Sequence, residues 1–174
     1  MVTVSPWEDS TEMAVNPLRK VPFLITDEGQ EVFDSRVICE YLDSQSESAC
    51  FLPAVSAERL AVKVRDAMVE GAMDAILTII MSKFVDPDMG DTTIWRQWLM
   101  SKANRVLEVL EKEIVGRDFQ DISDITCYCF LDFWLFRLEL LNEPDWRTNH
   151  PQLQAWFERM GERGSCKKTD PRNG

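Results

Sequence analysis

Asp34 and Ser35 stand directly before residues with helical periodicity, where their side chains suit the first turn of a helix. The amide groups of a first turn have no partner inside the helix, and the positive end of the helix dipole favours an anion there. A serine at this place either caps the helix or contributes to an anion-binding site. The pattern alone leaves both interpretations open.

A short β-rich run, residues 21–26, lies before this helix start. Lys20, Val21 and Pro22 stand at its beginning. A proline at the beginning of a strand is typical of a sheet edge, where its missing N–H is tolerated. Lys20 is read either as a solvated side chain or as a cation that could meet a carboxylate.

The cysteines and the single histidine indicate no metal centre and no nucleophilic triad. There are five cysteines, an odd number without framework spacing, and His150 has no second histidine to accompany it. Cys127 and Cys129 lie two residues apart, which on a helix directs them to different faces. We therefore expect reduced cysteines in a cytoplasmic protein, and no metal.

Charge and hydropathy exclude several classes of protein. The formal net charge is −11 over 174 residues, which argues against nucleic-acid binding because phosphate contacts require a surplus of lysine and arginine. The first fifteen residues lack the basic and apolar blocks of a secretory signal. The apolar stretch from Ile122 to Leu141 contains four charged residues, so a buried helix is favoured over a membrane span.

The first part of the chain combines short strands with one helix. Val2–Val4 reads as a short strand, residues 10–15 as a helical turn, and Asn16-Pro17 as a turn. Residues 21–26 and 31–33 read as two strands joined by Asp27-Glu28-Gly29-Gln30. A helix follows from Asp34 or Ser35 to about Asp43. Its predicted apolar face consists of Val37, Ile38, Tyr41 and Leu42.

The remainder of the chain reads as helical. Ser56 could cap a helix to about Phe84, and Asp91 or Thr92 a second helix to about Val115. The positions predicted to face inward on these two helices are Leu60, Val64, Met68, Ala72, Ala75, Ile76, Ile79, Ile80, Ile94, Trp98, Leu99, Val106, Leu107, Leu110 and Ile114.

A third helix is predicted from Asp121, with Asp124 completing a capping box in which both polar positions are aspartates. Its residues are apolar nearly all round, so it should be the central helix. A last helix follows His150-Pro151, with Leu153, Trp156, Phe157 and Met160 inward. The polar tail from Gly164 is expected to be loose.

Several motifs, in this order, resemble the glutathione-transferase family, and the bacterial cytosolic members in particular. They are NPLRKVPFLI from Asn16, FDSRVICEYLD from Phe33, RDAMVEGAMDA from Arg65, Asp121-x-x-Asp124, and DWRTNHP from Asp145 followed by Trp156-Phe157. Arg19 stands where glycine is common in the family. The similarity extends over about residues 1–166.

The resemblance implies an α+β fold: an N-terminally truncated thioredoxin-like domain followed by an all-α helical-bundle domain, the glutathione-transferase architecture. The corresponding division is 1–45 for the glutathione-binding domain, 46–55 for a linker, 56–166 for the helical domain and 167–174 for the tail. In the family the bond between Val21 and Pro22 is cis, which would free the Val21 backbone to pair with an extended peptide.

The resemblance also implies roles for the residues introduced first. Ser35 would hold the γ-glutamyl carboxylate of glutathione, Asp34 would face its ammonium, and Lys20 could reach its glycyl carboxylate. Val21 and Pro22 would complete the glutathione-binding site. On the long helix, the resemblance places Met68, Glu70 and Gly71 at the cleft or at a dimer interface. The family's roles carry over to these positions less specifically than to the loop and the helix start.

Family members carry a further strand and helix before the position of Val2, with a Ser, Cys or Tyr between them that activates the glutathione sulfur. No counterpart is identified here, because Thr3 and Ser5 fall in the second strand, so the catalytic residue is unknown. We consider three interpretations: a gene-model or fragment start, a shift of Val2–Val4 into the vacant place, or a strand supplied by a partner chain.

Three functions follow as hypotheses. The first is a homodimeric glutathione transferase that conjugates its co-substrate glutathione to a small hydrophobic electrophile. The sequence does not identify this electrophile. The second is a non-catalytic module of the same fold that binds a ligand or a protein. The third is a helical binding protein in which the β segment has no role in binding.

Overall fold

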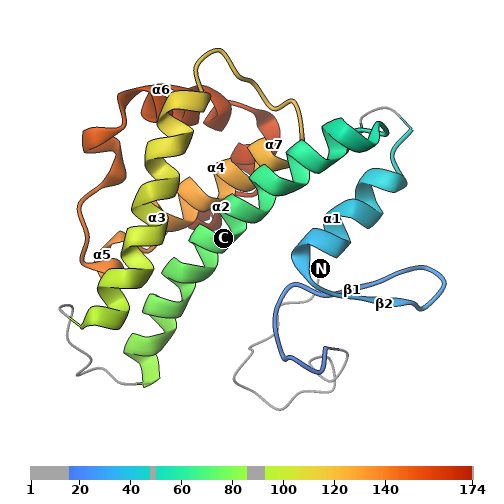
Figure 1. Cartoon of the computed structure of the whole chain (residues 1–174). Helices are drawn as coiled ribbons and strands as arrows, with labels where there is room; N and C mark the ends of the chain where they lie inside the picture. The colour runs from blue at the N-terminus through green and yellow to red at the C-terminus, as the bar shows by residue number, and fades with distance from the viewer. Residues whose placement is uncertain (1–15, 48–49, 86–92, 174) are drawn as a thin grey trace. The chain divides into compact units, whose positions relative to one another are not determined.

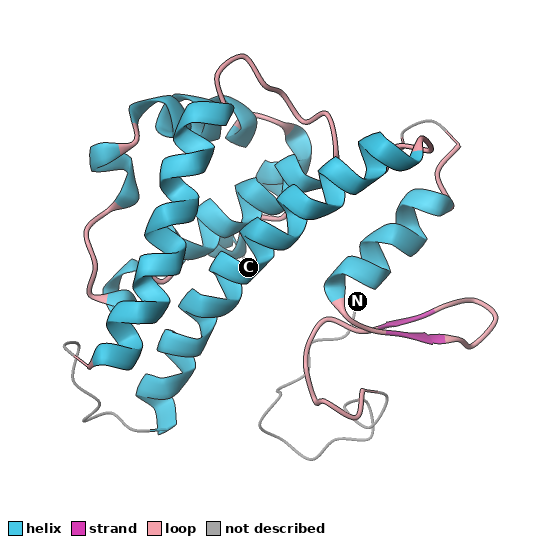
Figure 2. Cartoon of the chain, in the orientation of Figure 1, coloured by secondary structure: helices cyan, strands magenta, loops and turns pink. Residues whose placement is uncertain are grey.

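A computed structural model describes residues 16–47, 50–85 and 93–173 of this chain. The predicted strand at Val2–Val4, the predicted turn at residues 10–15, and the predicted caps Asp91 and Thr92 lie outside these residues. The chain divides into two compact units, Met1–Leu52 and Pro53–Gly174. Helices make up most of the second unit, whereas the two strands belong to the first (Figure 2).

The first unit contains the hairpin β1 (Leu24–Ile25) and β2 (Glu31–Val32), which are antiparallel, with Leu24 opposite Val32. Both strands are shorter than the predicted ranges 21–26 and 31–33. At the turn, Gly29 has a φ of +80°, which glycine adopts without steric cost. Its N–H donates to the Thr26 carbonyl at 2.9 Å, and the Thr26 N–H donates to the Gln30 carbonyl at 2.9 Å.

Helix α1 (Ser35–Ser44) follows the hairpin, as predicted (Figure 1). Its predicted apolar face is only partly confirmed: Ile38 is buried and Tyr41 is half-buried, but Val37 and Leu42 are exposed. The Asp43 carboxylate accepts hydrogen bonds from the Phe51 and Leu52 amides. The end of the first unit is thereby tied back to α1.

The second unit is built on α2 (Ser56–Val85), α3 (Ile94–Glu113) and α4 (Ile122–Phe136). Helix α2 packs against both α3 and α4, and α6 (Pro151–Gly161) contacts α3 and α4. The shorter elements are α5 (Leu138–Leu141), η2 (Trp146–Asn149), α7 (Gly164–Lys168) and η3 (Pro171–Asn173). None of the helices within the described residues is long and apolar enough to cross a membrane.

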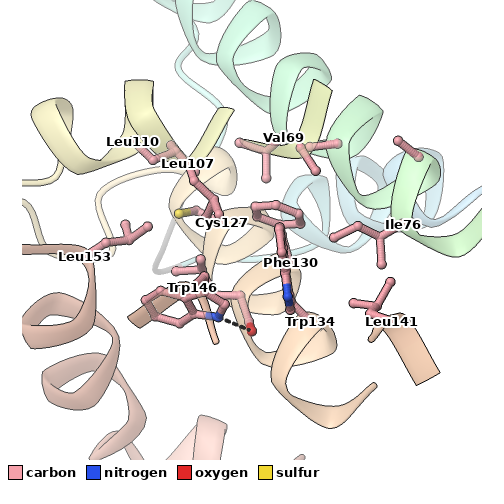
Figure 3. Packing of buried hydrophobic residues seen from close by; sticks show 14 of the residues in the cluster. Val69, Ile76, Leu107, Leu110, Cys127, Phe130, Trp134, Leu141, Trp146 and Leu153 are labelled. Carbon is pink, nitrogen blue, oxygen red and sulfur yellow. Dashed lines mark hydrogen bonds between the residues drawn. The ribbon is translucent and has the colours of Figure 1, made fainter. Parts of the chain in front are cut away.

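Buried side chains from α2, α3 and α4 meet residues of the segment 141–153 in one hydrophobic core (Figure 3). Phe130 and Trp134 of α4 are almost fully buried, as expected of the central helix. The Trp146 indole N–H donates to the Leu131 carbonyl at 3.2 Å, so this ring is satisfied inside the core. The predicted capping box is also confirmed, with Asp121 as N-cap and Asp124 three residues into α4.

Four of the predicted inward positions are wrong. On α2, Leu60 is 65% exposed and Val64 62% exposed, whereas Val69 is buried. On α3, Ile94 is 86% exposed and Trp98 is also exposed, while Arg96, Met100 and Ala103 are buried. Helices α2 and α3 carry apolar residues on more than one face, so periodicity alone did not identify the face that packs.

Two predicted helix boundaries and the predicted loose tail also differ from the structure. Ser56 is the first residue of α2 rather than its cap, and Thr93 caps α3 by accepting from the Arg96 amide at 3.3 Å. The tail forms α7 and η3, because Cys166 is buried and Arg172 pairs with Asp132 of α4. Tertiary contacts thus order a segment whose composition is polar.

Candidate functional site

The loop before the hairpin is organised by Asn16, which is almost fully buried. Its side-chain amide donates to the Lys20 carbonyl at 2.8 Å, and its side-chain oxygen accepts from the Leu18 amide at 2.9 Å. Its carbonyl accepts from the Arg19 amide at 2.8 Å. Asn16 was recognised in the sequence only as part of a turn signal, yet it holds the loop that carries Lys20 and Val21.

Arg19 occupies the left-handed region of backbone conformation, with a φ of +50°. Residues with a Cβ rarely adopt this conformation, and glycine does so without cost. The structure therefore supplies a physical reason for the glycine that is common at this position in the family resembled. In this chain an arginine adopts this conformation.

The Val21–Pro22 peptide bond is cis, as predicted. Val21 is exposed, and within the described residues neither its N–H nor its carbonyl takes part in a hydrogen bond. Strand β1 begins only at Leu24. The Val21 backbone therefore has the hydrogen-bonding capacity that an added extended peptide would use.

At the start of α1, Asp34 is the N-cap and its side chain accepts from the Arg36 amide at 3.0 Å. The Asp34 carbonyl accepts from the Ile38 amide at 3.0 Å. Ser35, the first residue of the helix, is half-buried, and its hydroxyl and amide have no hydrogen-bond partner among the described residues. This first turn thus keeps donors available at the positive end of the helix dipole.

The Asp34 carboxyl is held in its ionised form. The guanidinium of Arg36 donates to it at 3.2 Å, and this contact, the Arg36 amide and the nearby charge of Lys20 lower its pKa below 3.8. Burial acts in the opposite direction but is outweighed. Arg36 was not among the predicted site residues, although its position two residues after Asp34 is visible in the sequence.

The predicted site residues come from the loop before the hairpin and from the start of α1 after it. Lys20 lies close enough to Asp34 to affect its pKa, and Ser35 follows Asp34 in the chain. All of them are exposed or half-buried. The arrangement presents a carboxylate, free helix amides, a hydroxyl, a cation and an open backbone position, which suits a zwitterionic peptide. Among the described residues, no group of His, Cys, Asp and Glu side chains could hold a metal ion.

Residues 2–45 match the sequence profile of the glutathione S-transferase N-terminal domain. An uncharacterised GST-like protein of Escherichia coli K12, YibF, is 32% identical over 161 residues, which is 90% of this chain and 77% of YibF.

Solved structures of glutathione transferases have the same fold. A family member from Pseudomonas fluorescens Pf-5 with bound glutathione has a TM-score of 0.81 at 32% identity, covering 98% of this chain and 83% of that protein. A second structure of that protein holds S-(propanoic acid)-glutathione, with a TM-score of 0.75. A glutathione transferase from Methylobacillus flagellatus KT with bound glutathione has a TM-score of 0.79 at 28% identity, covering 91% and 79% of the two chains.

The two-stranded hairpin, its helix and the following helical bundle agree with the predicted α+β architecture, in which a thioredoxin-like part is followed by a helical domain. The sequence profile, the relative and the solved structures agree on the same fold. This chain belongs to the glutathione S-transferase family.

Proposed function

We propose that this protein binds glutathione along the loop 20–22 and the first turn of α1. The observation that carries the proposal is Ser35, whose hydroxyl and amide stand without a partner in the described residues at the positive end of α1. They would receive the γ-glutamyl carboxylate, because a helix start is a ready anion site. The ionised Asp34 would face the ammonium group of the same residue.

The rest of the tripeptide would lie along Val21. Its N–H and carbonyl would pair with the cysteinyl backbone as an added strand does, and Pro22 would adjoin this position. Lys20 would meet the glycyl carboxylate. Support comes from the free hydrogen-bonding groups of Val21 and from relatives whose structures hold glutathione.

Arg36 would have to share Asp34 with the ligand. Both side chains of this ion pair are about half exposed, at 51% for Arg36 and 50% for Asp34. An ionised carboxylate has about four acceptor positions, so an ammonium could bind without complete loss of the Arg36 contact. Exchange of such an exposed pair costs little.

Calorimetric titration with glutathione tests the site. The change Ser35→Ala should weaken binding about tenfold, equivalent to about 1.4 kcal/mol, because a charge-assisted hydrogen bond is lost. Ser56→Ala is the matched control, since Ser56 is also a serine at the first position of a helix and lies in the second unit. Equal losses in both variants, or none in Ser35→Ala, would overturn the assignment of Ser35.

We further propose that bound glutathione is conjugated to small hydrophobic electrophiles. Support comes from the S-(propanoic acid)-glutathione held by the Pseudomonas relative. A chromogenic aryl halide assay at saturating glutathione measures the reaction directly. Glutathione binding without turnover, also at a higher pH that favours the thiolate, would assign a binding role alone.

A homodimer is proposed as the working form. Leu60 and Val64 lie four residues apart on α2, so they share one helix face, and both are largely exposed despite being apolar. We expect light scattering to report a dimer, and the double change Leu60→Glu with Val64→Glu to convert it to monomers. A monomeric unmodified protein would contradict this.

We place the protein in the cytoplasm. All five cysteines carry free thiols, which is typical of a reducing compartment. Fractionation of cells that express the tagged chain would test the assignment.

A further inference from the structure

The helical unit contains a cavity of about 430 Å³ that the glutathione site does not use. Helix α3 contributes Asn104, Leu107 and Glu108 to its wall, α4 contributes Trp134, and the segment from Glu143 to His150 supplies the remaining side. A volume of this size is within the range of small-molecule sites. All of these residues belong to the unit Pro53–Gly174.

The wall formed by residues 143–150 is held by side-chain hydrogen bonds. Arg96, a buried residue of α3, donates to Glu143 at 2.6 Å and to the Leu141 carbonyl. Asp145 accepts from the Arg147 amide at 2.9 Å and so caps η2, and Trp146 is anchored by the Leu131 carbonyl. This wall is therefore preorganised, which lowers the entropy cost of binding a ligand.

A similar anchor fixes the end of the wall at His150. The carboxylate of Glu111 accepts from the Gln152 and Leu153 amides at 2.9 and 2.8 Å, which caps α6 immediately after His150. His150 Nδ1 lies 2.7 Å from the Trp146 carbonyl. A carbonyl only accepts hydrogen bonds, so Nδ1 carries a proton and donates to it.

The charged groups that line the cavity are carboxylates. Glu108, Glu143 and Asp145 contribute carboxylates, and neither lysine nor arginine lines the cavity in the described part of the chain. Arg96 pairs with Glu143 and Arg147 pairs with Asp145. Glu108 is exposed and has no ion-pair partner among the described residues, so its carboxylate is available to a ligand.

Apolar surface adjoins this charge. Leu107, Trp134 and Trp146 line the same cavity and are buried, and an indole face attracts cations as well as apolar groups. We propose that the cavity binds a small organic cation, a primary ammonium or guanidinium attached to an apolar body. The cation pairs with Glu108, and the body packs against Leu107 and the indoles.

Calorimetric titration with phenethylamine, a protonated aryl amine at neutral pH, tests this proposal on the full chain. We expect saturable binding at millimolar concentrations, and none of hydrocinnamate, an anion of similar size. Glu108→Gln keeps the shape of the side chain and should weaken binding at least about tenfold, which corresponds to about 1.4 kcal/mol. Asn104→Trp, an exposed position on the cavity wall, should fill the cavity and abolish binding.

Glu58→Gln is the matched control, because Glu58 is an exposed helical glutamate outside the cavity. It should bind phenethylamine as the unmodified protein does, and circular dichroism checks that all variants fold. The proposal is overturned if phenethylamine does not saturate, if hydrocinnamate binds equally well, or if Glu108→Gln retains full affinity. None of these outcomes depends on glutathione, so the two sites are tested separately.

Discussion

Helices α1 and α4 both begin after an aspartate, but the two helix starts have different surroundings. At α1, the Asp34 side chain is half exposed and its partner is Arg36, two residues away. At α4, the Asp121 side chain accepts from the Ser123 amide at 2.9 Å and from Arg117 at 3.0 Å. At the first helix start the Ser35 hydroxyl has no partner among the described residues, whereas at the second the Ser123 hydroxyl donates to Asp121.

Asp124 completes the arrangement at α4. Its carboxylate is fully buried and accepts from Arg65 at 2.9 Å and twice from Arg117, each time at 2.9 Å. The Gln120 amide donates to it as well, at 3.1 Å. The same contacts raise the pKa of Arg117, first through its hydrogen bond with Asp124.

The difference separates a structural cap from a candidate binding cap. Where every acceptor is occupied by buried donors, a polar cluster stabilises the fold and has no capacity for a ligand. Where the hydroxyl and amide of the first turn remain without partners in the described residues, the same local motif can take an anion. The following predictions test this contrast, beginning with the largest expected effect.

The two cysteines of α4, Cys127 and Cys129, differ in solvent exposure and therefore in reactivity. Cys127 is fully buried, and burial raises the pKa of its thiol to about 12, while Cys129 is exposed. We expect alkylation of Cys127 to be at least about a thousandfold slower than that of Cys129, because it requires unfolding of the core. Peptide mass spectrometry after timed alkylation measures both rates, and comparable rates would contradict an enclosed α4.

The Cys127 thiol also sets a direction for stability at high pH. Its folded pKa lies above the reference value of 9.0, so the unfolded state releases this proton first as the pH rises. The contribution of this group to stability is therefore lost progressively above pH 9.0 and towards the folded value of about 12. Replacement by alanine should remove that part of the pH dependence.

Asp124→Ala should cause the largest loss of stability. The change leaves the Arg65 and Arg117 guanidinium groups without their buried partner, which costs about 3–5 kcal/mol of unfolding free energy. Urea denaturation measures the loss. Asp118→Ala is the control, because Asp118 lies at an exposed position and pairs only at 3.6 Å with Arg163. Similar losses in both variants would show that the buried cluster stabilises the fold no more than an exposed ion pair does.

The change from aspartate to asparagine should separate the two caps. Asn caps a helix as well as Asp does, so Asp34→Asn should leave stability within about 0.5 kcal/mol while it weakens glutathione binding about tenfold through loss of the charge. Asp121→Asn should do the reverse, with a loss of about 1 kcal/mol of stability and unchanged binding. Calorimetric titration measures glutathione binding of both variants, and urea denaturation measures their stability. The opposite pattern would remove the distinction between the caps.

Arg19→Gly is expected to have the smallest effect, a stabilisation of about 0.5 kcal/mol from release of the positive φ, partly offset by the entropy of glycine. Arg19→Ala retains the conformational cost and removes the contacts of the arginine side chain. Thermal unfolding should rank glycine above alanine. A glycine variant less stable than the alanine variant would mean that the φ of Arg19 carries no strain.

Local patterns predicted the elements that rest on neighbouring residues. The spacing of Asp121 and Asp124 predicted the capping box, and His150-Pro151 predicted the start of α6. The resemblance predicted the cis bond between Val21 and Pro22. The roles of Lys20, Val21, Pro22, Asp34 and Ser35 in binding glutathione stay predictions, as do the domain boundaries.

Contacts between distant residues were not accessible to the same reasoning. Asn16 reads as an ordinary turn residue, and only the structure reveals that its side chain bonds to Leu18 and Lys20. Glu111 reads as a solvated helical glutamate, yet it caps α6, which begins 40 residues later in the chain. Such partners are joined by the fold and leave no periodic signal.

The sequence by itself determined the family, the order of the elements and the two aspartate caps, because these depend on motifs and on interactions a few residues long. Tertiary structure decided which apolar faces are buried, since Leu60 and Ile94 are as hydrophobic as the residues that pack. It also decided that the polar tail folds against α4. Asp124 is bound by arginines, whereas Ser35 has no hydrogen-bond partner among the described residues. Burial and the pairing of charges depend on which surfaces meet, and local sequence does not encode that.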